Sequence, residues 1–242
     1  MKAIIKKELK LFLSNQLSIV TICVLLLLYG LILFTNLFNL NLLDNGYANL
    51  DSFFNLSPLI FMIYIPAITM RSFSEEYKNG TIEILLSKPI STLKLIFSKF
   101  ISVYIIIVLS IIPTLIYPLS IYLLGEEVGN IDMGGTIGSY LGLFLLCSIF
   151  TSISIFSSSL TKHQVNAFLI ALLLNIFIYY GIDIIGQFIN NGNISLVITK
   201  SGILHHYELL SKGLISFNDI VYFISVSYLF LIFTNHIITI KK

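Results

Sequence analysis

The chain has 242 residues, of which 57% are hydrophobic and 11% are charged, and its formal net charge is +2. A soluble globular domain carries roughly 25% charged residues, so this chain has too few charges to cover a water-exposed surface. The composition excludes an ordinary soluble enzyme, a nucleic-acid-binding module and a disordered protein, and it indicates an integral membrane protein.

The first 14 residues form an amphipathic pattern. Three apolar residues, Ile5, Leu9 and Phe12, recur at helical spacing, and lysines surround them. A basic amphipathic helix of this kind lies in the membrane interface. We therefore expect an interfacial helix at 1–14, with a frayed basic tail as the alternative.

Six long uncharged runs follow, and each can hold the roughly 20 apolar residues of a membrane-spanning helix. The runs are continuously apolar and lack the alternation of barrel strands. The predicted fold is therefore all-α, a single polytopic transmembrane domain over 1–242 with six spans. The spans are expected at about 17–38, 53–70, 99–124, 137–160, 164–185 and 220–240.

The basic residues predict the orientation. All of the 14 lysines and arginines except Lys200 and Lys212 fall in the two termini or in the segments after the second and fourth spans. By the positive-inside rule that side is cytoplasmic. Both termini are therefore predicted inside, and their agreement supports an even number of spans.

The cytoplasmic segment after the second span, 71–95, is rich in local signals. Ser72 and Glu75 match a capping box, and Gly80 suits a helix end. A second short helix is expected from about 81 to 88. Pro89 then stops it, because the residue before a proline disfavours helix. Together these signals predict a compact helical elbow.

The length and composition of this segment suggest a docking surface. A connection between two spans needs only a few residues, whereas this one has nearly thirty and mixes acids with Phe73, Tyr77, Ile82 and Leu85. Amphipathic helices of this kind usually pack against a membrane or a protein. The alternative is a solvated connector.

The same segment resembles the coupling-helix region of ABC-2-type transporter permeases. The resemblance rests on Glu75-Glu76-x-x-x-Gly80-Thr81-x-Glu83-x-Leu85-Leu86-x-x-Pro89. The longer pattern from Arg71 to Glu83, followed by Lys88-Pro89-Ile90-Ser91, is similar to the gliding-motility-associated (GldF-like) permease subunit of Bacteroidota, as is Ser157-Ser158-Ser159-Leu160-Thr161-Lys162.

The resemblance implies a permease that pairs with a second permease subunit, as a homodimer or a heterodimer, in the bacterial cytoplasmic (inner) membrane. Two ATPase subunits would bind below it, and their ATP-driven closure would move the spans toward export or toward gliding-motility machinery. The residues implied at or near the ATPase contact are Arg71, Phe73, Glu75, Glu76, Tyr77, Gly80, Thr81, Glu83 and Pro89.

The chain has no phosphate-binding loop of the form G-x-x-x-x-G-K-[ST]. ATP is therefore expected in a partner chain, and no catalytic residue, cofactor or metal site is expected here. The expected partners are an ABC ATPase, the second permease subunit and membrane lipid, without nucleic acid. A non-transporting membrane scaffold for a motility or secretion assembly is the alternative function, and the substrate is left open.

The segment between the fifth and sixth spans, 186–219, is expected at the outer membrane interface. The uncharged run 184–199 contains glycines and asparagines and is expected to be a loop or interfacial piece. Beyond it, the sequence fits an amphipathic helix at the outer interface, with apolar positions at Ile203, Leu204, Tyr207, Leu210 and Leu214.

Overall fold

The computed structural model describes residues 1–14, 16–35, 42, 49–87, 90–124, 129–189 and 192–241. The regular elements in these ranges are all helices, which confirms the predicted all-α class. In chain order they are α1 (Lys2–Leu13), α2 (Gln16–Phe34), α3 (Asp51–Thr69), α4 (Arg71–Lys78), α5 (Thr81–Leu86), α6 (Thr92–Ile111), η1 (Ile112–Leu115), α7 (Ile116–Leu124), α8 (Met133–Leu160), α9 (Gln164–Gln187), α10 (Gly192–Lys200), α11 (Ile203–Ser211) and α12 (Phe217–Ile240).

Within the described ranges, five helical segments are long and apolar enough to cross a membrane. They correspond to the second to sixth predicted spans: Asp51–Lys78, Thr92–Leu124, Met133–Leu160, Gln164–Gln187 and Phe217–Ile240. The first predicted span falls on α2, which is apolar over Ile19–Phe34. The end of that prediction, 36–38, lies outside the described residues. A polytopic membrane protein is therefore confirmed, and the count of six stays a prediction.

Helix α8 is the centre of the bundle and packs against α3, α6, α9, α11 and α12. It carries many small hydroxyl residues, which let neighbouring helices approach closely. Several of these hydroxyls donate within the helix, as Ser154 Oγ does to the Phe150 carbonyl at 2.6 Å, whereas Ser158 Oγ donates to the Met70 carbonyl at 3.2 Å. Of its most apolar stretch 72% is buried, against 22% for α9 and 28% for α12. Helices α9 and α12 therefore present broad faces outward.

The third predicted span is interrupted near its middle. Helix α6 gives way to the short 3-10 helix η1 and then to α7. Pro113 lies at the start of η1. Because proline has no backbone N–H, the hydrogen bond that residue 113 would donate to residue 109 is missing, and the α-helical ladder breaks there.

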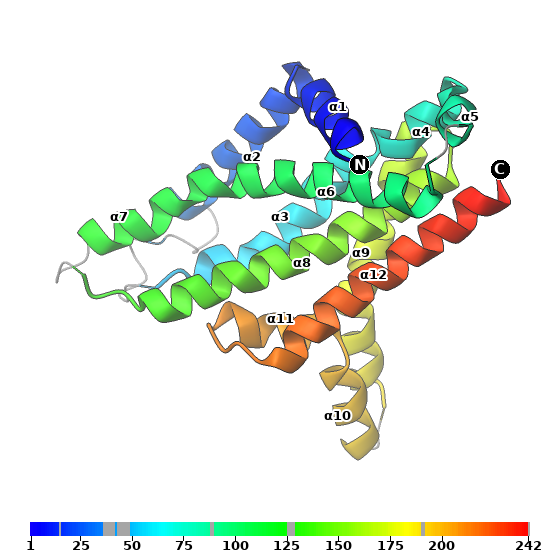
Figure 1. Ribbon diagram of the computed structural model, residues 1–242. Helices are drawn as coiled ribbons and strands as arrows, with labels where there is room; N and C mark the ends of the chain where they lie inside the picture. Colours follow the sequence, from blue (N-terminus) through cyan, green and yellow to red (C-terminus); the bar gives the residue numbers. More distant parts are fainter. Residues whose placement is uncertain are drawn as a thin grey trace.

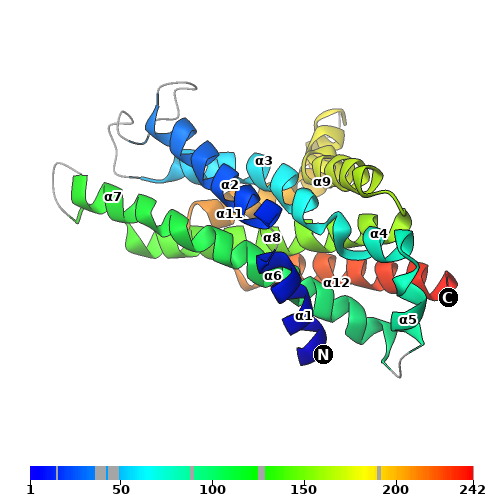
Figure 2. The same ribbon diagram turned by 90° about the horizontal axis from the view of Figure 1, so that it is seen from above.

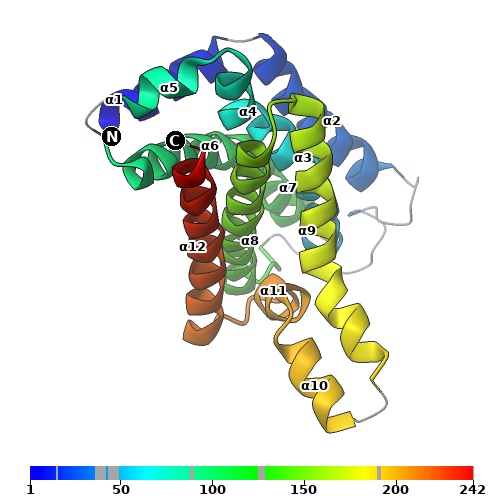
Figure 3. The same cartoon turned by 90° about the vertical axis from the view of Figure 1, so that its right-hand side faces the viewer.

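The bundle has two distinct ends (Figures 1 and 3). Helices α1, α4 and α5 lie at one end together with both ends of the chain, whereas α10 and α11 lie at the other. Seen from above, α1 crosses α6 (Figure 2). We call residues 71–87, which hold α4 and α5, the elbow, and we call this side of the bundle the elbow end.

The segment after α9 differs from the prediction. Most of the described part of the run 184–199 is helical, because α9 continues to Gln187 and α10 begins at Gly192, whereas 188–189 are not helical. Ser195 Oγ donates to the Gly186 carbonyl at 2.7 Å and ties α10 to the end of α9. With nine residues, α10 is too short to span a membrane. Most of the run is therefore helix and not loop, whereas the alternative of an interfacial piece and the prediction against a seventh span are consistent with the short length of α10.

Helix α11 occupies the position of the expected amphipathic helix. Its apolar residues Ile203, Tyr207 and Leu210 are buried in the protein core. Tyr207 Oη donates to the Phe54 carbonyl at 2.7 Å. A Cβ at Gly142 of α8 would lie 2.5 Å from Leu210 Cβ, so the two helices are in direct contact there. The apolar face of α11 therefore packs on α3 and α8 and not on a membrane surface.

Candidate functional site

The elbow is built around one glycine. Helix α4 follows α3 after Met70 and ends at Asn79, and Gly80 then adopts a left-handed conformation with φ of 67°. Glycine takes this conformation without the steric cost that a Cβ imposes. Helix α5 starts directly afterwards at Thr81. The predicted break at Gly80 and the second short helix are both confirmed.

The start of α4 is capped differently from the prediction. Met70 already has a helical backbone, and Ser72 lies inside the helix without a side-chain capping bond, so the capping box prediction is wrong. The cap comes from α8 instead. Ser158 Oγ accepts hydrogen bonds from the Phe73 N–H at 2.9 Å and the Ser74 N–H at 3.2 Å. A tertiary contact therefore satisfies first-turn donors that the local sequence leaves open.

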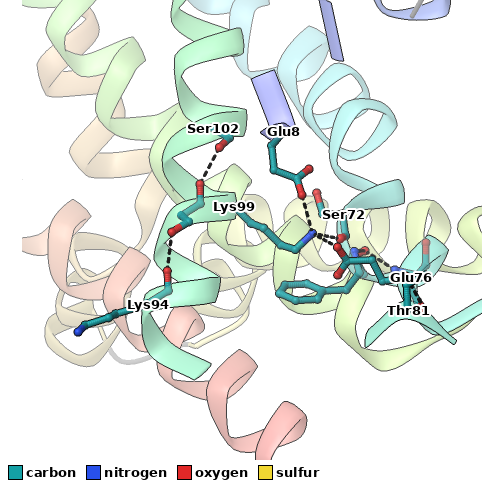
Figure 4. A network of polar contacts seen from close by, with 11 residues as sticks. Glu8, Ser72, Glu76, Thr81, Lys94, Lys99 and Ser102 are labelled. Carbon is teal, nitrogen blue, oxygen red and sulfur yellow. Dashed lines mark hydrogen bonds and ion pairs between the residues drawn. The ribbon is translucent and has the colours of Figure 1, made fainter. Parts of the chain in front are cut away.

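A buried lysine joins the elbow to two other helices (Figure 4). Lys99 of α6 is 2% exposed, and its Nζ lies 2.8 Å from Glu76 Oε1 of α4 and 3.2 Å from Glu8 Oε1 of α1. Nζ also donates to the Ser72 carbonyl at 2.6 Å. An ammonium has three N–H donors, so these three acceptors satisfy all of them.

The carboxyl of Glu76 lies beyond the apolar part of its helix, yet it is largely buried. Its second oxygen, Oε2, is buried and has no hydrogen-bond partner among the described residues. Glu76 is therefore an internal residue of the joint between α1, α4 and α6.

Apolar contacts reinforce the same joint. Phe73 and Ile82 of the elbow are buried in a cluster with residues of α6, α8 and α12. The Lys99 Nζ also lies 4.9 Å from the centroid of the Phe73 ring, which adds a cation–π contact. Within the described ranges, no three His, Cys, Asp or Glu side chains gather as metal ligands would. The elbow is a short helical hairpin whose base is fixed to the bundle.

Comparison with known proteins then decides the family. A family model described as ABC-2 family transporter protein matches residues 2–234. The chain belongs to this family. It is therefore a transmembrane subunit of an ABC transporter and not itself a catalytic chain. No curated protein matches it. The ABC-2 resemblance is thus confirmed, and the gliding-motility subtype stays a prediction.

Of the nine predicted coupling residues of this ABC-2 family member, the structure describes eight, and these divide into two groups. Phe73 is fully buried, Arg71, Glu76 and Tyr77 are partly buried, and Pro89 lies outside the described residues. The outward group consists of Glu75, Gly80, Thr81 and Glu83, all exposed. The structure therefore places these eight residues on one hairpin, half of them buried or partly buried and half of them exposed.

Three further residues belong to this region, although the sequence patterns did not single them out in these roles. Ile84 is 62% exposed beside Glu83 and gives the hairpin an apolar tip. Ser158 caps α4 from α8, and Lys99 anchors Glu76. Of the three, only Ile84 could have been found from the sequence, because it is an isoleucine next to an acid. Ser158 and Lys99 act through residues that are distant in sequence.

The C-terminal end of α12 also contacts the elbow. Lys241 Nζ donates to the Ser159 carbonyl at 2.7 Å and the Leu160 carbonyl at 3.0 Å, at the end of α8. The same atom lies 4.8 Å from the centroid of the Tyr77 ring. Partial burial lowers the pKa of the Lys241 ammonium, and neighbouring Lys162 lowers it further. Lys241 thus ties α12 to both α8 and α4.

Proposed function

We propose that a separate ATPase subunit binds the exposed face of the elbow and drives this transporter subunit through it. The observation that carries the proposal is the contrast between the two ends of the hairpin. Glu83 and Ile84 are exposed at its tip, whereas Phe73 and Glu76 are held in the bundle at its base. A partner can therefore contact the tip while the base passes its movement on.

The exposed face has the chemistry of a docking surface. Glu75 and Glu83 offer carboxylates and Ile84 offers an apolar side chain beside them. At protein interfaces, complementary charges at the rim favour encounter and orientation, and apolar anchors supply much of the affinity. We infer a groove on the ATPase with basic side chains around an apolar floor.

The base of the elbow is attached rigidly enough to transmit a displacement. The Ser158 bonds link α4 to α8, and the Lys99 ion pairs link it to α6 and α1. Because both attachments are buried, they are poorly screened by solvent. Movement of α4 would therefore carry the inner ends of α6 and α8 with it, and α8 contacts most of the bundle.

We further propose that α2 is the sixth span, that both termini lie in the cytoplasm, and that the protein resides in the bacterial inner membrane. The lysines of α1, the elbow end of α6 and Lys241 support this orientation under the positive-inside rule. The largely unburied α9 and α12 leave room for a second permease subunit, of the same or a different kind. Coupled hydrolysis would drive export or gliding-motility machinery.

Co-purification tests the proposal. The chain is expressed with candidate ABC ATPases from the same organism, and retention of an ATPase is measured for Glu83→Lys and Ile84→Asp. Both variants are expected to lose most of the bound ATPase, since one reverses a charge and the other places a carboxylate at the apolar anchor. Glu208→Lys, an exposed acid on α11 at the opposite end, serves as the control. Equal retention in all three variants contradicts docking at the elbow.

A further inference from the structure

A cavity of about 720 Å³ lies beside the elbow. It is open on part of its surface, and it is lined by α1 and α2 on one side and by α3, the elbow and α6 on the other. Ligand pockets in proteins typically hold about 300–1,000 Å³. This cavity is therefore large enough for the headgroup of an amphiphile and part of an acyl chain.

The lining changes from polar to apolar along α3–α4 and α6. Along α4 and α3, the lining residues Glu75 and Arg71 are followed toward the bundle by Ile68 and Ala67. Along α6, Lys99 is followed by Val103 and Ile106. The polar part thus lies at the elbow and the apolar part lies among the spans. This is the polarity of one lipid leaflet from its headgroups inward.

The polar part of the lining has as many basic as acidic side chains. Some of these charged side chains form no ion pair within the described part of the protein. Lys99 is already occupied by Glu8 and by one oxygen of Glu76. Among the described residues Lys7 and Arg71 make no ion pair, and Glu76 Oε2 has no hydrogen-bond partner. Glu75 adds an exposed carboxylate. The cavity therefore offers two cations for an anion and two carboxylates, of which that of Glu76 has a buried oxygen to which no described residue donates.

We propose that this cavity binds a phospholipid whose headgroup carries both a phosphate and a primary ammonium, as phosphatidylethanolamine does. Lys7 and Arg71 bind the phosphate, and Glu75 and Glu76 accept hydrogen bonds from the ammonium. One acyl chain lies along Ala67, Val103 and Ile106. A buried acceptor without a partner costs free energy, so a ligand that supplies N–H donors is favoured.

Because Glu75 and Glu76 accept hydrogen bonds, the cavity should discriminate between lipids by the donors of their headgroups. Phosphatidylcholine has the same net charge as phosphatidylethanolamine, but its quaternary ammonium has no N–H to donate. Phosphatidylglycerol supplies hydroxyl donors but adds net negative charge beside Glu75 and Glu76. The ethanolamine lipid is therefore expected to bind more tightly than either. This inference goes beyond the proposed function and does not depend on the ATPase.

Native mass spectrometry of the purified full-length chain tests the proposal. The protein is equilibrated without ATPase in detergent micelles that contain equal amounts of the three lipids, and retained lipid is measured. One ethanolamine lipid per chain is expected. Arg71→Gln is expected to reduce its occupancy at least about tenfold, the effect of losing one charge-assisted hydrogen bond. Glu75→Gln should reduce the preference over phosphatidylcholine.

Two matched controls complete the experiment. Lys94→Gln removes an exposed cation of α6 that lies outside the cavity and should leave occupancy unchanged. Ala67→Phe fills the apolar part and should expel the lipid, whereas Leu173→Phe, on an exposed face of α9 outside the cavity, should not. Equal retention of the three lipids, or equal occupancy in the Arg71→Gln and Lys94→Gln variants, overturns the proposal. Failure to bind an ATPase leaves it intact.

Discussion

Lys99 Nζ lies 2.8 Å from Glu76 Oε1, and the lysine side chain is only 2% exposed. The pair joins a spanning helix to the elbow. A charge removed from water is costly unless it is paired and hydrogen-bonded, and here the Ser72 carbonyl and Glu8 complete the pairing. This geometry shows that Glu76, predicted from the family resemblance to face a partner, has an internal partner.

Replacing Lys99 should destabilise the protein strongly. Lys99→Met leaves the carboxylates of Glu8 and Glu76 without their counter-ion, and loss of one member of a buried pair costs about 3–5 kcal/mol. Thermal unfolding in detergent measures the loss. Lys94→Met, which changes an exposed lysine of the same helix, is the control. The assignment fails if the two variants unfold at the same temperature.

Ser158→Ala should loosen the start of α4. The substitution removes the acceptor of the Phe73 and Ser74 amides, and an unsatisfied buried donor costs about 1–3 kcal/mol. Hydrogen exchange at those two amides should become faster. Ser157→Ala is the matched control, because that hydroxyl donates only to the Ile153 carbonyl of its own helix. Unchanged exchange at residues 73 and 74 would show that α4 does not depend on this cap.

Gly80→Ala should strain the elbow without any steric clash. No atom lies within 4 Å of a Cβ built at this position, so the penalty comes only from the left-handed backbone and amounts to about 1–2 kcal/mol. Asparagine tolerates this conformation better, so Gly80→Asn should recover part of the loss. Gly30→Ala, in helical backbone with equal space around it, should be neutral or slightly stabilising. Unfolding measurements on the three variants compare these costs.

Labelling should place the elbow and α11 on opposite sides of the membrane. In a Cys23→Ser background, where Cys147 is buried, single cysteines are introduced at Thr81 and Glu208, both exposed. A membrane-impermeant maleimide applied to sealed spheroplasts should modify the Glu208→Cys variant, and the Thr81→Cys variant only after permeabilisation. Labelling of Thr81→Cys in sealed spheroplasts would reverse the proposed orientation and remove the basis for ATPase docking.

Local sequence patterns were sufficient to predict many of the helices of this protein. Continuous apolar runs predicted the five helical segments that are long and apolar enough to cross a membrane, because such a helix must satisfy its backbone internally and present apolar side chains. Gly80 predicted the break between α4 and α5 because its conformation depends on one residue. In the run 184–199, glycine and asparagine favoured the prediction of a loop because they disfavour helix when only the local sequence is considered. There Gly186 instead allows α10 to pack closely on α9, since a Cβ would lie 2.4 Å from Thr199 Cγ2.

The amino-acid sequence by itself determined that this chain is a helical membrane protein, where its apolar helices run, and where the elbow bends. The tertiary structure alone decided which residues of the elbow face outward and which hold it in place. Lys99 meets Glu76 across 23 positions and Glu8 across 91, and Ser158 caps α4 across 85. No local periodicity encodes contacts at such separations, because they form only when packed helices bring distant segments together.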